Sequence, residues 1–253
     1  MAETDNDNAS EDREQPLIAH LTELRDRLIR SLVVMLLVFL VLMPFSEALY
    51  SAIARPLIDA LPVNSSMIAT EVASPFLVPF KLVLFLALFV SMPYLLYQTW
   101  AFIAPGLYRN EKRFALPLLA SSILLFYCGT AFAFFVVFPL LFAFFTSVAP
   151  AGVTVMTDIS HYLDFILKLF FAFGLAFEVP IATILLVATG VATVESLSQK
   201  RPFIILGAFV VGMLLTPPDV ASQVLLAGPI WLLFELGLIF ARYFAPEPDD
   251  EEE

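Results

Sequence analysis

Apolar residues in this chain are gathered into long runs, which short polar segments separate. Six of these runs are predicted to form helices, at about residues 28–45, 74–100, 114–145, 161–190, 202–218 and 220–243. A helix that crosses a bilayer needs about 20 mainly apolar residues. The pattern therefore predicts an all-α integral membrane protein with six transmembrane helices. We expect the last two crossings to be short, so that the bilayer thins around them.

An amphipathic segment precedes the first apolar run. Its charged residues leave one apolar face at helical spacing, formed by Leu17, Leu21, Leu24 and Leu28. Pro16 is expected to begin the helix, because the first helical position needs no backbone N–H. We expect this segment to lie along the membrane surface and to lead into the first crossing.

The first loop, residues 46–80, is too charged and too rich in proline to cross a membrane. It still carries an apolar helical face, formed by Leu49, Ile53, Leu57 and Leu61. Short amphipathic helices packed over the outer mouth of the bundle are therefore expected here. Ser74 and Pro75 have the residue types of a cap and a first helical position, and indicate the start of the second crossing.

Residues 114–157 form the longest uncharged stretch, 44 residues in all. This is too many for one crossing and too few for two with a loop between them. Because residues 146–154 have loop composition, we expect one long helix to about position 145, bent near Pro117 or Pro139. Pro93 is expected to kink the second crossing in the same way.

Composition supports a membrane protein with acidic ends. Of the 253 residues, 60% are hydrophobic and 15% charged, too few polar groups to cover a soluble protein of this size. The net charge of −11 arises at the ends, since six acids lie within residues 1–14 and six within 247–253. We therefore expect disordered acidic tails at 1–14 and 244–253, and a membrane domain at 15–243. We find no pattern typical of nucleic-acid binding.

Lysine and arginine set the orientation, because acids count little in the positive-inside rule. Ten of them fall on the side of the two termini and three on the other side, at Arg55, Lys81 and Lys168. This asymmetry places both termini in the cytoplasm, as an even number of crossings requires. With this orientation the first loop lies on the opposite side of the membrane.

Patterns typical of enzymes are missing from the sequence. It contains no His-Glu-x-x-His, no Gly-x-Ser-x-Gly, no P-loop and no Gly-x-Gly-x-x-Gly. His20 and His161 fall near opposite membrane faces, so they cannot share a metal ion. We therefore expect neither catalysis nor a cofactor or metal.

Polar residues inside the crossings are candidate functional positions, because burying them in a bilayer is costly. Glu178 lies in the middle of the fourth crossing; it is either hydrogen-bonded within the bundle or faces a wetted cavity or a partner helix. Thr216 and Gln223 have the same two interpretations. For Glu235, close to Arg242, a structural role is favoured.

Two cytoplasmic acids, Glu23 and Glu111, are candidates for binding a cationic ligand. Taken alone, Glu23 is best explained by an i,i+4 pair with Arg27, and Glu111 by its basic neighbours. Taken together, they place two carboxylates at one membrane face, each beside apolar residues. A carboxylate there can bind a guanidinium through two parallel hydrogen bonds, more specifically than an ammonium.

Five segments carry a resemblance to a known family. They are Gln-Pro-Leu-Ile-Ala-His-Leu-Thr-Glu-Leu-Arg (15–25), Met-Ile-Ala-Thr-Glu-Val-Ala-Ser-Pro-Phe (67–76), Gln-Thr-Trp-Ala-Phe-Ile-Ala-Pro-Gly-Leu-Tyr (98–108), Phe-Glu-Val-Pro (177–180) and Gly-Met-Leu-Leu-Thr-Pro-Pro-Asp (212–219). In this order they resemble the TatC family, the multi-spanning receptor subunit of the twin-arginine protein translocase, and its enterobacterial type closely.

The resemblance implies a function. TatC proteins bind the paired arginines in the signal peptides of folded precursors, act with the single-span subunits TatB and TatA, and use the proton-motive force. The positions that match signal-peptide binding are Glu23, Arg25, Phe102 and Glu111. Those that match intramembrane contacts with partner helices are Glu178, Met213, Thr216 and Gln223. A homo-oligomeric arrangement within the receptor complex is also implied, as is a location in the bacterial inner membrane, with the first loop in the periplasm.

One position departs from the family pattern. Family members often carry Tyr where this chain has Phe134, so a hydroxyl role there is not expected. The alternative function is secondary transport of a small solute, which Glu178 and the broken crossings would suit. That alternative predicts an inverted repeat, and the two halves show no convincing similarity.

Overall fold

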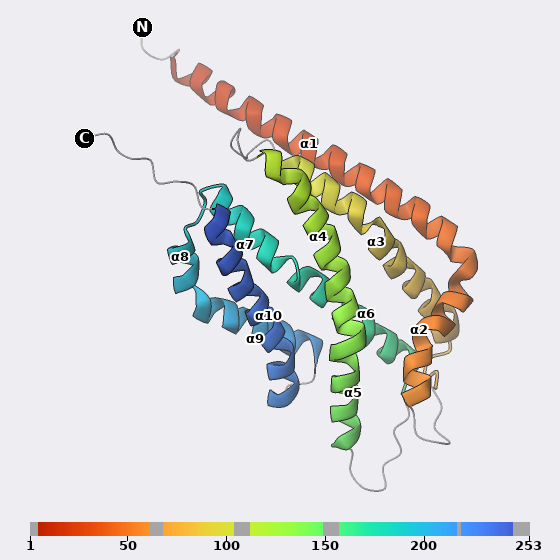
Figure 1. The fold of residues 1–253 in the computed structure, drawn as a ribbon. Helices are drawn as coiled ribbons and strands as arrows, with labels where there is room; N and C mark the ends of the chain where they lie inside the picture. The colour runs from red at the N-terminus through yellow and green to blue at the C-terminus, as the bar shows by residue number, and fades with distance from the viewer. Residues whose placement is uncertain (1–4, 61–67, 104–111, 149–156, 217–218, 245–253) are drawn as a thin grey trace.

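The computed structural model describes residues 5–60, 68–103, 112–148, 157–216 and 219–244. These residues form helices, with no strand among them beyond one isolated β-bridge. Five helical stretches are long and apolar enough to cross a membrane, and a sixth, α9 (Arg201–Leu215), is shorter. Figure 1 shows the start of α1 (Asp5–Leu42), the end of α3 (Ser74–Ile103) and the end of α10 (Val220–Ala241) at one end of the bundle, here called the terminus side. The opposite end, with α2 and the end of α5, is called the elbow side.

Helix α1 (Asp5–Leu42) is one continuous helix of 38 residues, roughly 57 Å long. The expectation of a separate helix lying along the membrane surface is wrong, because α1 continues in line into the first crossing (Figure 1). The physical reason is that residues 17–42 contain neither glycine nor proline to end it. The helix also begins at Asp5, ahead of Pro16 and within the segment expected to be a disordered tail. The domain limits themselves stay a prediction.

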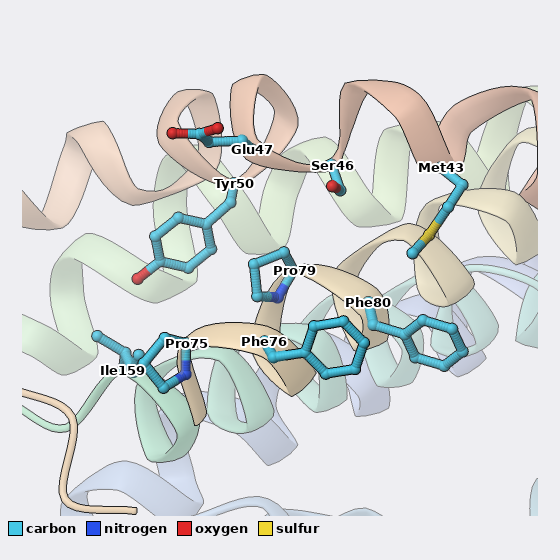
Figure 2. A pocket seen from close by; sticks show the side chains of 9 residues that line it. All are labelled: Met43, Ser46, Glu47, Tyr50, Pro75, Phe76, Pro79, Phe80 and Ile159. Carbon is cyan, nitrogen blue, oxygen red and sulfur yellow. The ribbon is translucent and has the colours of Figure 1, made fainter. Parts of the chain in front are cut away.

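An elbow follows α1, where a short 3₁₀ turn (Met43–Phe45) with Pro44 leads into α2 (Ser46–Ala60). Leu49 and Ile53 of α2 pack on buried residues of α3 (Ser74–Ile103) and α6 (Ile159–Ala176). This confirms these two residues of the expected apolar face, while the side chain of Leu57 and the whole of Leu61 lie outside the described part of the chain. Between the elbow and α3 lies a wedge-shaped cavity of about 440 Å³, shown in Figure 2. Phe76 and Phe80 of α3 line it from one side, and Met43 and Tyr50 from the other.

The third crossing contains α4 (Lys112–Phe132), a π-helical turn (Ala133–Val137) and α5 (Phe138–Ser147). Of the two bends considered, the irregularity lies at Pro139 rather than at Pro117, which sits inside regular α4. Since Pro139 has no N–H to donate, the preceding turn widens into the π-helix. Phe134 lies in this turn and packs edge-on against Phe170.

The fourth crossing is broken where a single helix was expected. Helix α6 (Ile159–Ala176) ends before Phe177 and Glu178, and α7 (Val179–Ala188) begins directly after them. Pro180 explains the break, because it cannot donate the backbone bond that would continue α6. The crossing of α4 over α6 is close at this level: a Cβ on Gly129 would lie 2.4 Å from the carbonyl oxygen of Phe173.

A short helix, α8 (Val194–Gln199), connects α7 to α9, and α10 (Val220–Ala241) is the last crossing. With 15 residues, α9 is short, as expected. The expectation of a short last crossing is wrong, since the 22 residues of α10 rise about 33 Å. Arg201 joins α9 to α10 through two bonds to Glu235, Nε to Oε1 at 2.6 Å and Nη2 to Oε2 at 2.9 Å. Glu235 thus has the structural role that was favoured, with Arg201 as its partner.

Asp158 fastens the first loop to the start of α6 on the elbow side. Its carboxylate accepts bonds from the hydroxyl and the N–H of Thr70, at 2.6 and 2.8 Å, and from the N–H groups of Ser160 and His161 at the start of α6. Backbone bonds from Ile68 to Thr157 and from Ile159 back to Ile68 complete the junction. These bonds hold the pKa of the Asp158 carboxyl well below its usual range, the Thr70 hydroxyl first among them.

Candidate functional site: a groove between α1 and α3

Helices α1 and α3 lie side by side, and near the terminus side they enclose a groove of about 220 Å³. Its walls are mostly apolar. The lining residues from α1 are Leu24, Arg27, Leu28 and Ser31. Those from α3 are Leu95, Gln98, Thr99 and Phe102. An apolar groove with polar groups at one end is the usual form of a peptide-binding or ligand-binding site.

Glu23 does not line the groove itself; it is bound by Arg27, which does, one helical turn further along α1. Both Nε and Nη2 of Arg27 donate to a single oxygen, Oε1 of Glu23, at 3.0 and 2.6 Å. Oε2 of Glu23 accepts no hydrogen bond from the described residues. The side chain of Glu23 is 40% exposed and that of Arg27 is 21% exposed. The i,i+4 pair expected from the sequence is therefore present, and it leaves half of the carboxylate open to a ligand.

Arg27 also fastens α1 to α3. Its Nη1 donates to Oε1 of Gln98 at 3.1 Å, and its Nη2 donates to the carbonyl of Ala101 at 3.2 Å. Gln98 in turn donates to the hydroxyl of Tyr94 at 2.7 Å. Sequence reasoning missed Gln98. The sequence did indicate it, because Gln98 places an amide within a long apolar run and a buried amide needs a hydrogen-bond partner inside the protein.

Phe102 lines the groove, and its part in signal-peptide binding stays a prediction. Its ring stacks on His20 of α1 with centroids 4.2 Å apart and planes inclined by 18°. Arg25 is not brought into the groove, because its guanidinium is bound to Asp26 and stays largely exposed. Glu111 lies outside the described residues, so its separation from Glu23 stays a prediction.

Glu178 lies at the break between α6 and α7. The hydroxyl of Ser122 on α4 donates to Oε2 of Glu178. Oε1 of Glu178 is buried and has no hydrogen-bond partner among the described residues. The structure therefore shows a bond within the bundle for one oxygen of Glu178 and leaves the other available.

The other three intramembrane candidates lie around the α9–α10 connection. Thr216 is buried, and its hydroxyl donates to the carbonyl of Gly212 on its own helix. A Cβ on Gly212 would lie 3.6 Å from the backbone of Gln223, so α9 and α10 pack closely here. Met213 is 52% exposed. No hydrogen bond joins this group to Glu178 within the described residues, so it forms a second location.

Comparison with known proteins gives one family. The family model described as "Sec-independent protein translocase protein (TatC)" matches residues 19–229. The chain is 61% identical over 229 residues to Sec-independent protein translocase protein TatC of Azotobacter chroococcum mcd 1, with 90% of each chain covered. It is 54% identical over 239 residues to the protein of that name from Escherichia coli strain K12, covering 94% of this chain and 93% of the relative.

A solved structure of a TatC protein has the same fold as this chain. The crystal structure described as the twin arginine translocase receptor TatC superposes with a TM-score of 0.80 at 37% sequence identity. The match covers 89% of this chain and 99% of that one. The chain therefore belongs to the TatC family of Sec-independent protein translocases.

Proposed function

We propose that this protein is the receptor of a twin-arginine translocase and that the groove between α1 and α3 holds the signal peptide. In this proposal the terminus side faces the cytoplasm and the elbow side faces the periplasm, in agreement with the distribution of lysine and arginine. Folded precursors with paired arginines dock on the terminus side and are exported with TatB and TatA, driven by the proton-motive force. The observation that carries the proposal is the half-open carboxylate of Glu23, which is bound by Arg27 of an apolar groove.

The chemistry of the groove suits such a peptide. One arginine of the signal binds Glu23, where a planar guanidinium fits a carboxylate better than an ammonium does. Glu111 supplies the carboxylate for the second arginine, and Arg25, with its guanidinium exposed beside Asp26, orients the peptide backbone. The apolar segment of the signal lies along Leu24, Leu28 and Leu95, with Phe102 closing the polar end.

A binding measurement with matched variants tests this proposal. The full chain in nanodiscs is titrated with a fluorescent twin-arginine peptide, and Glu23→Gln and Glu111→Gln are compared with Glu195→Gln, which changes an exposed acid in the first turn of α8. We expect each of the first two to weaken binding by about tenfold or more, and Glu195→Gln to leave it unchanged. Unchanged affinity in both would refute the site, and equal affinity for a Lys-Lys peptide would refute bidentate recognition.

We also propose that the exposed face of α9 receives a single-span partner, TatB or TatA. Met213 contributes apolar contact there, while Thr216, Gln223 and Glu178 supply hydrogen-bonding groups that a helix in the membrane would otherwise lack. Repeated copies of the receptor assemble around such contacts. A photo-crosslinker at Met213 should capture the partner. The same crosslinker at Val211, which is exposed on the opposite face of α9, should not.

A further inference from the structure

A second groove, of about 380 Å³, lies between the first turns of α3 and α6 on the elbow side. Its polar side chains include Glu71, Lys81, His161 and Asp164. Its apolar wall comes mainly from α3, where Leu77 and Leu84 lie on either side of Lys81 on one helical face. From Lys81 inward to Leu84 the lining therefore changes from charged to apolar, which is the polarity of a phospholipid molecule.

The groove contains an ion pair between Lys81 and Asp164, whose hydrogen-bonding groups the protein satisfies only in part. Lys81 is bonded to Asp164, yet their side chains remain 47% and 35% exposed. An ammonium has three donors and a carboxylate about four acceptor sites. Within the described residues, the bond between the two is the only hydrogen bond that either side chain makes.

The position of this ion pair along the apolar helices makes its unused hydrogen-bond donors and acceptors energetically unfavourable. Lys81 lies two turns into the apolar helix α3, about 10 Å from its start. Asp164 lies in the second turn of α6. A charged group that faces hydrocarbon at such a depth is unfavourable unless water or a polar head group meets it. A ligand with both donors and acceptors would satisfy the two residues at once.

We propose that this groove binds one glycerophospholipid whose zwitterionic head group ends in a primary ammonium. The phosphate accepts from Lys81, and the ammonium donates to Asp164 and Glu71. The acyl chains run inward from the ion pair along the exposed side chain of Leu84. With two acids and one lysine, the groove does not favour an anionic head group, and a quaternary ammonium has no N–H to donate. Lys168, one turn deeper on α6, does not line the groove.

The neighbouring wedge extends the apolar part of the site. Phe80 lines both the groove and the wedge in Figure 2, whose apolar walls include Phe76 and Pro79. Since Phe80 lies at the border of the two spaces, a lipid seated there can place one acyl chain on each side of this ring. This inference does not depend on signal-peptide binding at the other end of the bundle.

Native mass spectrometry of the full chain tests the proposal. The protein is exchanged into detergent with equal amounts of dioleoyl phosphatidylethanolamine, phosphatidylcholine and phosphatidylglycerol, and the retained lipid is counted. We expect the ethanolamine lipid to be retained preferentially, and Lys81→Gln and Asp164→Asn each to lower its retention about tenfold. Lys200→Gln, which changes an exposed lysine on the terminus side, should retain it fully.

A further variant separates lipid binding from folding. Leu84→Trp fills the apolar end of the groove and leaves the ion pair in place, so it should lose the lipid while its melting temperature in detergent without lipid stays near that of the wild type. Equal retention of all three head groups would overturn the proposal, as would preference for phosphatidylglycerol. Full retention by Asp164→Asn would overturn it as well.

Discussion

Arg27 occupies one oxygen of Glu23, the carboxylate that is proposed to receive an arginine of the ligand. Two of its N–H groups donate to Oε1 of Glu23, while two further bonds hold it to Gln98 and Ala101 of α3. The receptor thus keeps an internal guanidinium at the carboxylate that is proposed to receive an external one. Because Arg27 has its own partners on α3, it can release Glu23 without being left unpaired.

The first prediction follows from this competition. Arg27→Gln should increase the affinity for a twin-arginine peptide up to about fivefold, because a partly exposed ion pair contributes only about 0.2–1 kcal/mol. Glutamine can still donate to Gln98 or Ala101. Fluorescence anisotropy with the labelled peptide measures the change.

Arg55→Gln is the charge-matched control for this prediction. It removes one positive charge from an exposed position in α2 on the elbow side, and it should leave peptide affinity unchanged. Weaker binding by Arg27→Gln would mean that Arg27 helps to hold the ligand, and it would contradict the competition between the two guanidinium groups.

The crossings could be predicted from the sequence because hydrophobic length is a strong signal. The expected second crossing from Ser74 onward agrees with α3, and the apolar face of Leu49 and Ile53 agrees with the packing of α2. The continuity of helices was harder to predict. The amphipathic segment before the first crossing has the composition of a surface helix, yet nothing in residues 17–42 breaks the helix, so α1 runs straight.

The site could be predicted in part. Of the residues expected to bind the signal peptide, Phe102 lines the groove and Glu23 is bonded to Arg27, which also lines it, while their role stays a prediction. The role of Gln98 depends on which face of α3 meets α1, and periodicity is weak in a helix that is apolar on all sides. The break at Glu178 had a local signal in Pro180, but proline is tolerated in many membrane helices, so the sequence alone does not decide.

A second prediction concerns pH and the junction at Asp158. Its folded pKa lies below the ordinary value of about 3.9 for an unfolded Asp. The charged form therefore stabilises the junction above about pH 4, and this stabilisation is lost as the pH falls below that value toward the folded pKa. Hydrogen-exchange protection factors for the amides of Ile68, Thr70 and Ile159, corrected for intrinsic rates, should fall between pH 5 and pH 3.

Asp158→Asn is the control for the pH prediction. Asparagine can still cap α6, because its side-chain oxygen accepts from the first-turn N–H groups as aspartate does. It does not titrate, so the protection factors of the variant should be lower than those of the wild type at pH 6 and independent of pH. An unchanged pH dependence in this variant would show that another group titrates at the junction.

A third prediction uses the close contact of α10 with α7. A Cβ on Gly237 would lie 2.9 Å from the Cα of Pro180 and 3.1 Å from the Cβ of Thr183, so a larger residue forces the two helices apart. Gly237→Val should lower the free energy of unfolding by about 1–3 kcal/mol. Thermal unfolding in detergent measures this. Gly207→Ala, where a Cβ meets nothing within 4 Å, should be neutral or stabilising; an equal loss there would contradict the steric explanation.

The fourth prediction concerns the bidentate pair of Arg201 and Glu235, which joins the start of α9 to the end of α10. Arg201→Gln and Glu235→Gln should each lower the melting temperature, since each leaves a partly buried charge without its partner. The melting temperature of the double variant should be little lower than that of either single variant, because the same ion pair is removed in all three. A double-mutant cycle by thermal unfolding should then give a coupling free energy of about 0.5–2 kcal/mol, reduced from the buried case because Arg201 is partly exposed. Additive losses would mean that the two residues act independently, through contacts such as the bond from Arg201 to Ser198.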